Sequence, residues 1–167
     1  MAKDYLKLAS EVLRNISYGT LATVAESGAP WNCPVIMVHD HELNFYWFSD
    51  RQSQHGRNVR RNPSVFIVIY DSTVPKHGLD HGVYVQAQAR EVSDKPTIEH
   101  ARKLLWGPGR TGAETYSGTS PRRVYHAVPE RVWVNDVEFG PDGKFVRDYR
   151  MELKLADLRG RLGNTAA

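Results

Sequence analysis

The sequence predicts a mainly β fold of the α+β kind, an antiparallel barrel with a few helices on its outside. Many short segments rich in Val, Ile, Tyr, Phe and Trp are separated by turns of hairpin length, as in antiparallel sheets. These segments do not alternate with helices, so a parallel βαβ sheet is not indicated. The 167 residues, 41% of them hydrophobic and 25% charged, suffice for one ordinary domain with its own core.

The first part of the chain is predicted to hold a helix, a three-stranded meander and a second, short helix. Apolar residues recur at helical spacing from Tyr5 to Ile16, and Asp4 precedes them as a candidate N-cap. Three β-rich segments then follow, joined by short turns: residues 20–25, 31–40 and 43–49. A short helix is expected over residues 53–62, with Ser53 as its N-cap.

The second part of the chain is predicted to complete the sheet and to add one more helix. Residues 64–71 form a continuous apolar run, which favours a strand buried on both faces. Residues 83–92 alternate between apolar and polar, while residues 95–106 have helical spacing and a proline near their start. One or two strands are expected over residues 124–139 and a last strand over residues 145–155.

Charge and cysteine content narrow the classes of function. The net charge of +3 is too small to indicate nucleic acid as a partner. Cys33 is the only cysteine, so no disulfide can form within the chain, which fits a reducing compartment. The first residues lack the continuous apolar core of a signal peptide, and no window approaches the roughly 20 apolar residues that span a bilayer. We expect a cytoplasmic protein without a membrane or nucleic-acid partner, with one domain over residues 1–155 and a loose tail over residues 156–167.

An abrupt change of chemistry at residues 45–63 suggests a binding site. Four large aromatic or apolar residues run directly into hydroxyl groups and arginines, at the junction of a strand end and a helix start. The N-terminus of a helix presents unpaired N–H groups and a partial positive charge, which suit a phosphate. Hydroxyls of Ser49 and Ser53 and the guanidinium of Arg51 complete a plausible phosphate cradle. The alternative is a solvated, arginine-rich surface helix in which Ser53 is only a cap.

Other reactive residues in the sequence carry no site of their own. His39 and His41, with His77 and His81, lack the cysteine partners and the second pair of ligands that usually accompany metal sites, so no metal is expected. Cys33 is interpreted as a small core residue, because a catalytic thiol requires a nearby histidine and an exposed setting. No Ser-His-Asp or paired-carboxylate arrangement is present, and no catalytic residue is assigned.

The order and spacing of these motifs resemble a known family. The segment "YGTLATVAESGAPWNCPVIMVHDHELNFYWFSDRQSQHGRNVRRNPSVFIVIYD", with the first helix, is similar to the pyridoxamine 5′-phosphate oxidase-like family of FMN-binding split barrels. The resemblance covers roughly residues 5–135. It implies a six-stranded antiparallel Greek-key split barrel with peripheral helices. It also implies a homodimer that holds two FMN molecules in clefts at its interface and acts on a small-molecule substrate.

The resemblance also implies which residues bind the cofactor. Strand residues would line the isoalloxazine ring, and an aromatic-hydroxyl pair would lie beside the flavin. A Ser-x-x triplet would bind the phosphate, and a tryptophan of the partner chain would cover the ring. Val35 and Ile36 correspond to the strand residues that would line the isoalloxazine ring, and Phe48 and Ser49 correspond to the aromatic-hydroxyl pair. Ser53 and His55 correspond to the phosphate-binding triplet, and Trp133 corresponds to the tryptophan that would cover the ring.

Departures from the family pattern shape the expected function. Where the oxidases have Arg-Lys, this chain has Gln54 and His55, and Arg51 is the residue that would compensate. The C-terminal Arg-x-His pair that holds the substrate phosphate is missing, so pyridoxamine phosphate is not the expected substrate. We therefore expect an FMN-binding oxidoreductase acting on another small molecule. Three alternatives stay open: a protein that binds the deazaflavin F420, a haem protein with His77, His81 or His126 as axial ligand, and a non-catalytic flavin-binding dimer.

Overall fold

The computed structural model describes residues 3–73, 81–109 and 112–163. Its seven strands form one antiparallel sheet in the order β3-β2-β1-β4-β5-β6-β7, and β3 also pairs with β6. This second pairing closes the first six strands into a barrel. The strands are β1 (Tyr18–Val24), β2 (Pro30–His39), β3 (Phe45–Asp50), β4 (Ser64–Ile69), β5 (Val83–Val92), β6 (Arg122–Phe139) and β7 (Phe145–Leu153). The predicted six-stranded antiparallel split barrel is confirmed, with β7 as an addition to it.

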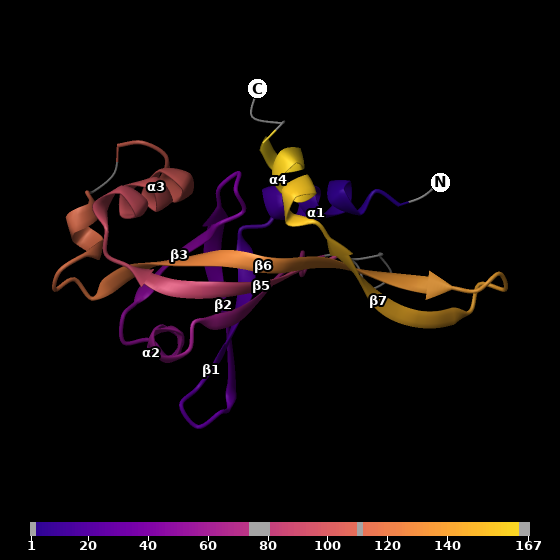
Figure 1. Ribbon diagram of the computed structural model, residues 1–167, viewed down its shortest axis with the longest axis horizontal. Helices are drawn as coiled ribbons and strands as arrows, with labels where there is room; N and C mark the ends of the chain where they lie inside the picture. Colours follow the sequence, from indigo (N-terminus) through magenta and orange to yellow (C-terminus); the bar gives the residue numbers. More distant parts are fainter. Residues whose placement is uncertain (1–2, 74–80, 110–111, 164–167) are drawn as a thin grey trace.

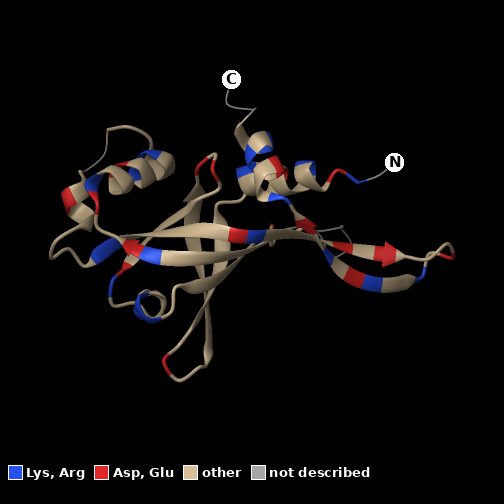
Figure 2. Ribbon diagram, in the orientation of Figure 1, with Lys and Arg blue, Asp and Glu red and all other residues tan. Residues whose placement is uncertain are grey.

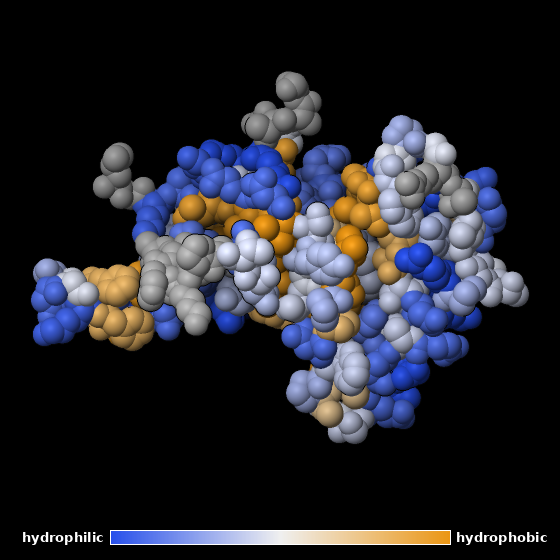
Figure 3. All heavy atoms as spheres, turned by 180° about the vertical axis from the view of Figure 1, so that it is seen from behind, coloured by the Kyte–Doolittle hydropathy of each residue, from blue (hydrophilic) through white to orange (hydrophobic). Residues whose placement is uncertain are grey.

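Strand β6 contributes to the barrel and also extends beyond it. Its first residues, 122–127, pair with β3, whereas residues 132–139 pair with β7. The β6–β7 hairpin therefore projects from one side of the barrel (Figure 1). Near its end it carries the exposed side chains of Phe139, Phe145 and Val146, which give the projection an apolar surface (Figure 3).

Four α-helices and one short 3-10 helix lie on the outside of the barrel (Figure 1). They are α1 (Tyr5–Asn15), α2 (Gln54–Arg61), α3 (Lys95–Trp106), α4 (Leu155–Gly163) and η1 (Ala113–Tyr116). The two predicted N-caps are confirmed, because the side chain of Asp4 accepts the N–H of Lys7 and that of Ser53 accepts the N–H of Gly56, at 3.0 and 3.1 Å. In the part of the chain that is described, none of the helices is long and apolar enough to cross a membrane.

Helix α4 corrects the expectation of a loose C-terminal tail. Residues 155–163 are helical, and Leu158 and Leu162, one turn apart, are buried in the main core. Helix α4 contacts α1, and Arg161 of α4 lies 3.4 Å from the carboxylate of Asp4. The expectation was wrong for residues 156–163 because two glycines in the segment obscured this leucine pair. The remaining residues of the expected tail, 164–167, lie outside the described part of the chain.

The barrel interior forms the main core, while the opposite side of several strands remains partly uncovered. In β4, Val65, Ile67 and Ile69 point inward and are buried, whereas Phe66 and Val68 are only half-buried. The expected burial of this strand on both faces is therefore wrong for the single chain. Strand pairing aligns these outward residues with others on β1, β2, β5 and β6. We call this surface the outer face: Tyr18, Ile36, Phe66, Val68, Tyr70, Tyr84 and Trp133.

Candidate functional site

A cleft of about 500 Å³ lies where β3 ends, and this volume falls within the usual range for small-molecule sites. Strands β1, β2, β3 and β6 and helices α2 and α3 all contribute side chains to it. Ten residues line it: Tyr18, Pro34, Val35, Ile36, Phe48, Ser49, His55, Leu105, Trp106 and Arg122. Tyr18 and Ile36 belong to the outer face and are 58% and 44% exposed, so the cleft opens onto that face.

The polar end of the cleft is organised around His55, in the first turn of α2. Its Nε2 atom lies 2.7 Å from the hydroxyl of Ser49 and 3.1 Å from that of Ser53. Its Nδ1 atom lies 3.3 Å from the sulfur of Cys33. Ser49 ends the inward-facing row of β3, and Ser53 caps α2, so the strand end and the helix start converge on one imidazole.

The histidine and the cysteine at this end are both neutral near pH 7. Burial lowers the pKa of His55, because the charged imidazolium loses hydration inside the protein. Burial likewise raises the pKa of the Cys33 thiol. The polar end therefore offers hydroxyl and ring N–H groups as hydrogen-bonding partners, but no formal charge.

Aromatic side chains form one wall of the cleft. Phe48 lies 4.6 Å from Trp106 and 4.9 Å from Tyr116 between ring centroids. Trp106 is the last residue of α3, so this helix delivers the indole to the cleft. Ile36 and Phe48 lie next to the Met37–Trp47 pair of the β2–β3 ladder, so Ile36 extends this wall, and Val35 adds a further apolar side chain to the lining. An apolar lining of this kind is suited to a flat ring system.

Most arginines near the cleft are already bound to protein groups. Glu91 on β5 lies 3.4 Å from Arg51, 3.3 Å from Arg60 and 2.9 Å from Arg123. Figure 2 shows the resulting concentration of charge at α2 and at the adjoining ends of β5 and β6. Arg51, the residue expected to replace the missing phosphate-binding charges, is therefore paired with Glu91 and does not line the cleft.

Trp133 lies on the outer face, away from the cleft of its own chain. Its indole stacks on Phe66 with a centroid separation of 6.1 Å, and the guanidinium of Arg131 lies 4.6 Å above it. The resemblance assigned this tryptophan to the cofactor of a partner chain, and that role stays a prediction.

The structure thus brings together most of the residues proposed from the sequence. Five of the eight line the cleft: Val35, Ile36, Phe48, Ser49 and His55. Ser53 adjoins the cleft through His55, whereas Arg51 and Trp133 lie elsewhere. Sequence reasoning missed five lining residues: Tyr18, Pro34, Leu105, Trp106 and Arg122. The last three lie more than 40 residues beyond the end of the motif at residue 63, and no local pattern connects them to it.

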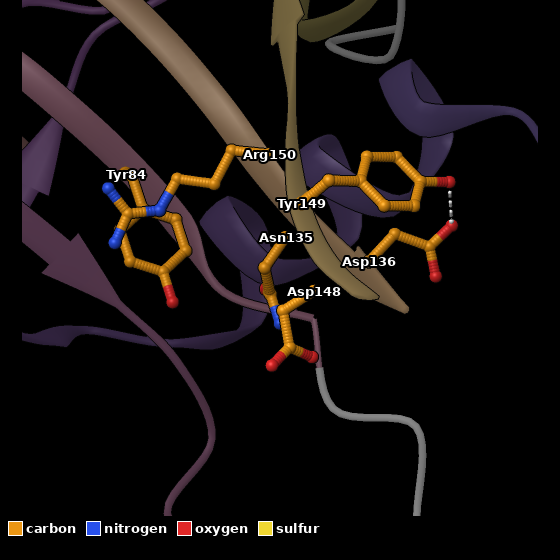
Figure 4. A pocket seen from close by; sticks show the side chains of 6 residues that line it. All are labelled: Tyr84, Asn135, Asp136, Asp148, Tyr149 and Arg150. Carbon is orange, nitrogen blue, oxygen red and sulfur yellow. Dashed lines mark hydrogen bonds between the residues drawn. The ribbon is translucent and has the colours of Figure 1, made fainter. Parts of the chain in front are cut away.

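A second, more polar pocket of about 320 Å³ lies between β5, β6 and β7 (Figure 4). One of its lining residues is Asp136, whose buried carboxylate accepts hydrogen bonds from Lys3, at 2.6 Å, and from the hydroxyls of Tyr5 and Tyr149, at 2.7 and 2.9 Å. The guanidinium of Arg150 lies 4.1 Å above the ring of Tyr84. The hydrogen bonds from Lys3 and Tyr5 to Asp136 hold the N-terminal segment against the β6–β7 hairpin.

Three of the other histidines lie away from the cleft. His39 contacts backbone carbonyls of Leu13 and Asp40, and His81 contacts that of Asn135. His126 stacks on Tyr46 and does not line the cleft. His77 lies outside the described residues. Within the described ranges, no group of three His, Cys, Asp or Glu side chains is arranged to hold a metal ion.

Comparison with known proteins relates this chain to one family. The family model described as pyridoxamine 5′-phosphate oxidase matches residues 6–136. A pyridoxine/pyridoxamine 5′-phosphate oxidase from Teredinibacter turnerae is 26% identical over 105 residues, which span 63% of this chain and 46% of that protein. The chain therefore corresponds to less than half the length of this relative.

Two solved structures share the fold at low sequence identity. A haem-binding protein from Mycobacterium smegmatis superposes with a TM-score of 0.69 at 18% identity, covering 96% of this chain and 62% of that one. An F420 reductase superposes with a TM-score of 0.55 at 19% identity, covering 79% of this chain and 98% of that one. Since the family model spans well over half of the sequence and the structure is the expected split barrel, the chain belongs to the pyridoxamine 5′-phosphate oxidase family.

Proposed function

We propose that this protein is an FMN-binding oxidoreductase that acts, as a homodimer, on a small molecule other than pyridoxamine phosphate. The observation that supports this proposal is the cleft at the end of β3. It combines an apolar, aromatic lining with a hydroxyl-rich end at the start of a helix, within about 500 Å³. A flat ring system with an anionic tail matches these features.

The residues present fit a flavin in a simple arrangement. Val35 and Ile36 would contact one side of the ring, and Phe48 would lie beside it. Ser49, Ser53 and His55 would donate hydrogen bonds to the phosphate, together with free N–H groups in the first turn of α2. Bound FMN would supply the electron-transfer chemistry. The chain would then hold and orient the reactants and exclude water, which agrees with the absence of a catalytic acid–base pair among the residues that line the cleft.

The C-terminal strands argue against pyridoxamine phosphate as the substrate. No Arg-x-His pair occurs between residues 131 and 153. The arginines that do occur there are engaged: Arg131 with Glu152 at 2.6 Å, Arg147 with Glu138 at 2.7 Å, and Arg150 with the ring of Tyr84. A substrate phosphate would have to displace these partners.

The outer face supports a homodimer. It is apolar and aromatic-rich, it is partly exposed in the single chain, and the cleft opens onto it through Tyr18 and Ile36. Exposed apolar surfaces of this kind mark sites of association. A second copy seated here would close the cleft and bring its own Trp133 toward it. We also place the protein in the cytoplasm, because its single cysteine fits a reducing compartment.

Haem and F420 are less well supported by the cleft. An axial haem ligand needs an accessible imidazole nitrogen. Among the described residues His55 is the only histidine that lines the cleft, and both of its nitrogens lie within hydrogen-bond distance of other side chains. Nothing in the cleft specifically favours F420 over FMN.

The absorption spectrum of the purified protein tests the proposal. FMN gives bands near 370 and 450 nm, F420 absorbs near 420 nm, and haem gives a Soret band; these values are approximate properties of the free cofactors. We expect the flavin spectrum, directly or after FMN is added, and bleaching when NADH or NADPH is added without oxygen. A colourless protein that does not bind added FMN would rule the proposal out. Flavin binding without reduction by any donor would favour the non-catalytic flavin-binding dimer.

A further inference from the structure

The serine and histidine side chains predicted to bind the phosphate carry no formal charge near pH 7. Ser49 and His55 line the polar end of the cleft, and both are neutral, since burial lowers the pKa of His55. No acidic residue lines the cleft within the described part of the chain, and a single basic residue, Arg122, does. A dianionic phosphate gains most from a guanidinium, which can donate two hydrogen bonds at once.

The other nearby arginines are committed to protein groups. Arg51, Arg60 and Arg123 share the carboxylate of Glu91 at 3.4, 3.3 and 2.9 Å. Arg57 of α2 donates to the backbone carbonyl of Gln52 and, at 2.6 Å, to the side-chain oxygen of Gln54. Recruiting any of them would break an existing interaction.

The alternation of strand β6 separates Arg122 from Arg123. Successive side chains of a strand point to opposite sides. Arg123 points inward, is 5% exposed, and also donates to the carbonyl oxygens of Gly118 and Ser120. Arg122 therefore points outward, where it is exposed and lines the cleft. Its guanidinium has no hydrogen bond or ion pair to any other described residue.

Strand pairing places Arg122 where β3 ends, beside the polar end of the cleft. Residues Asp50 and Arg122 are direct partners in the β3–β6 ladder, one residue beyond Ser49. The backbone N–H of Arg51 donates to the carbonyl of Pro121 at 2.8 Å, which fixes the start of β6 against the end of β3. Asp50 does not line the cleft, and its carboxylate accepts the N–H of Gln52 at 2.6 Å.

We propose that Arg122 binds the phosphate of the flavin and gives the cleft its preference for FMN over riboflavin. This inference rests on the proposed function, and it assigns the compensating charge to a residue 69 positions after Ser53 rather than to Arg51. Riboflavin lacks the phosphate but has the same ring, so the ratio of the two dissociation constants isolates the contribution of the anionic tail.

Titration of flavin fluorescence with wild type and single variants tests the inference. In Arg122→Ala we expect affinity for FMN to fall roughly ten- to one-hundred-fold, as for loss of a charge-assisted hydrogen bond, with little change for riboflavin. Arg122→Lys should retain most of the preference. Arg57→Ala, which removes the same charge from α2, is the matched control, and Arg51→Ala tests the competing residue. Both should change the FMN/riboflavin ratio less than about threefold.

The outcomes separate this inference from the proposed function. If the wild type binds neither flavin, both are overturned. If it binds FMN but Arg122→Ala, shown by circular dichroism to be folded, keeps the wild-type ratio, only the role of Arg122 is overturned. The same holds if the wild type does not discriminate between the flavins, or if Arg51→Ala loses more preference than Arg122→Ala.

Discussion

At the scale of single residues, the contact between Cys33 and His55 has the form of a neutral hydrogen bond. A thiolate–imidazolium pair would require a lowered thiol pKa and a raised histidine pKa. Burial moves both pKa values the other way. The 3.3 Å contact therefore fixes the orientation of the imidazole and does not activate the sulfur as a nucleophile.

This assignment predicts that the thiol of Cys33 is alkylated slowly in the folded protein. Because burial raises its pKa, Cys33 should react with iodoacetamide at pH 8 about tenfold or more slowly than the same cysteine in urea-unfolded protein. The rate is measured by mass spectrometry of quenched samples. A rate in the native protein equal to or above that in the unfolded protein would indicate that Cys33 is a reactive thiolate.

Asp136 illustrates a residue whose charge is stabilised by its neighbours. Burial alone would raise the pKa of this carboxyl group, but hydrogen bonds from Lys3, Tyr5, Tyr149 and the backbone of Val137 outweigh it and hold the pKa well below its usual range. The unfolded value is about 3.9. The resulting stabilisation is complete above about pH 5 and is lost progressively as the pH falls toward the folded-state pKa.

We therefore expect Asp136→Asn to lower the free energy of unfolding by about 1.5–3 kcal/mol at pH 7. The difference from wild type should shrink as the pH falls below about 4, since the carboxyl group of the unfolded wild type then becomes protonated while that of the folded protein stays charged. Urea unfolding at several pH values measures both effects. Asp148→Asn, an exposed carboxylate at the same pocket, is the control and should change stability by less than about 0.5 kcal/mol. Equal losses in the two variants at pH 7 would contradict this account.

At the scale of elements, helix α2 can approach the barrel only because it has a glycine at its contact point. A Cβ atom added to Gly56 would lie 2.5 Å from the hydroxyl of Tyr125, 2.9 Å from that of Ser53 and 3.1 Å from the carbonyl of Arg51. The first turn of α2 carries His55, so displacement of the helix would also move the polar end of the cleft.

Gly56→Ala is expected to destabilise the protein by about 1–3 kcal/mol and to weaken flavin binding, because the methyl group overpacks this contact. Gly160 of α4 provides the matched control, since a Cβ atom there would meet nothing within 4 Å. Gly160→Ala should stabilise by about 0.5–1 kcal/mol through helix propensity. Thermal unfolding and flavin titration of both variants measure these effects. If Gly56→Ala stabilises the protein as much as Gly160→Ala does, a methyl group fits beside α2 and the account is wrong.

The elements also show which features local sequence could predict. Asp4 and Ser53 were recognisable as caps because a cap and its helix lie within a few residues. The pairing of Arg51 with Glu91 was not, because it joins residues 40 positions apart that only the β3–β6 and β5–β6 ladders bring together. Arg122 was missed for the same reason, as its position depends on the β3–β6 closure. The sequence motif thus predicted the position of the cleft, but it did not predict which arginine lines it.

At the scale of the whole molecule, the strand pattern predicted the barrel but misjudged one surface. The run at residues 64–71 was taken as buried on both faces, yet in the single chain only its inward side is covered. A continuous apolar strand is typical of two-sided burial. The discrepancy is resolved if a second copy covers the outer face, which a single sequence does not reveal.

This argument predicts a dimer that depends on the outer face. Wild type should have a mass of about 38 kDa by light scattering, twice the 19.0 kDa of one chain. Tyr70→Glu places a charge on the outer face, where Tyr70 is 46% exposed, and does not alter a residue that lines the main cleft. It should weaken dimerisation at least about tenfold, because an unpaired charge would be buried, and FMN affinity should fall with it.

Leu104→Glu on α3, where the native side chain is 36% exposed, is the control and should leave the dimer intact. A wild type that stays at 19 kDa with flavin bound would exclude the dimer and leave the cleft open to solvent on the side of Tyr18 and Ile36.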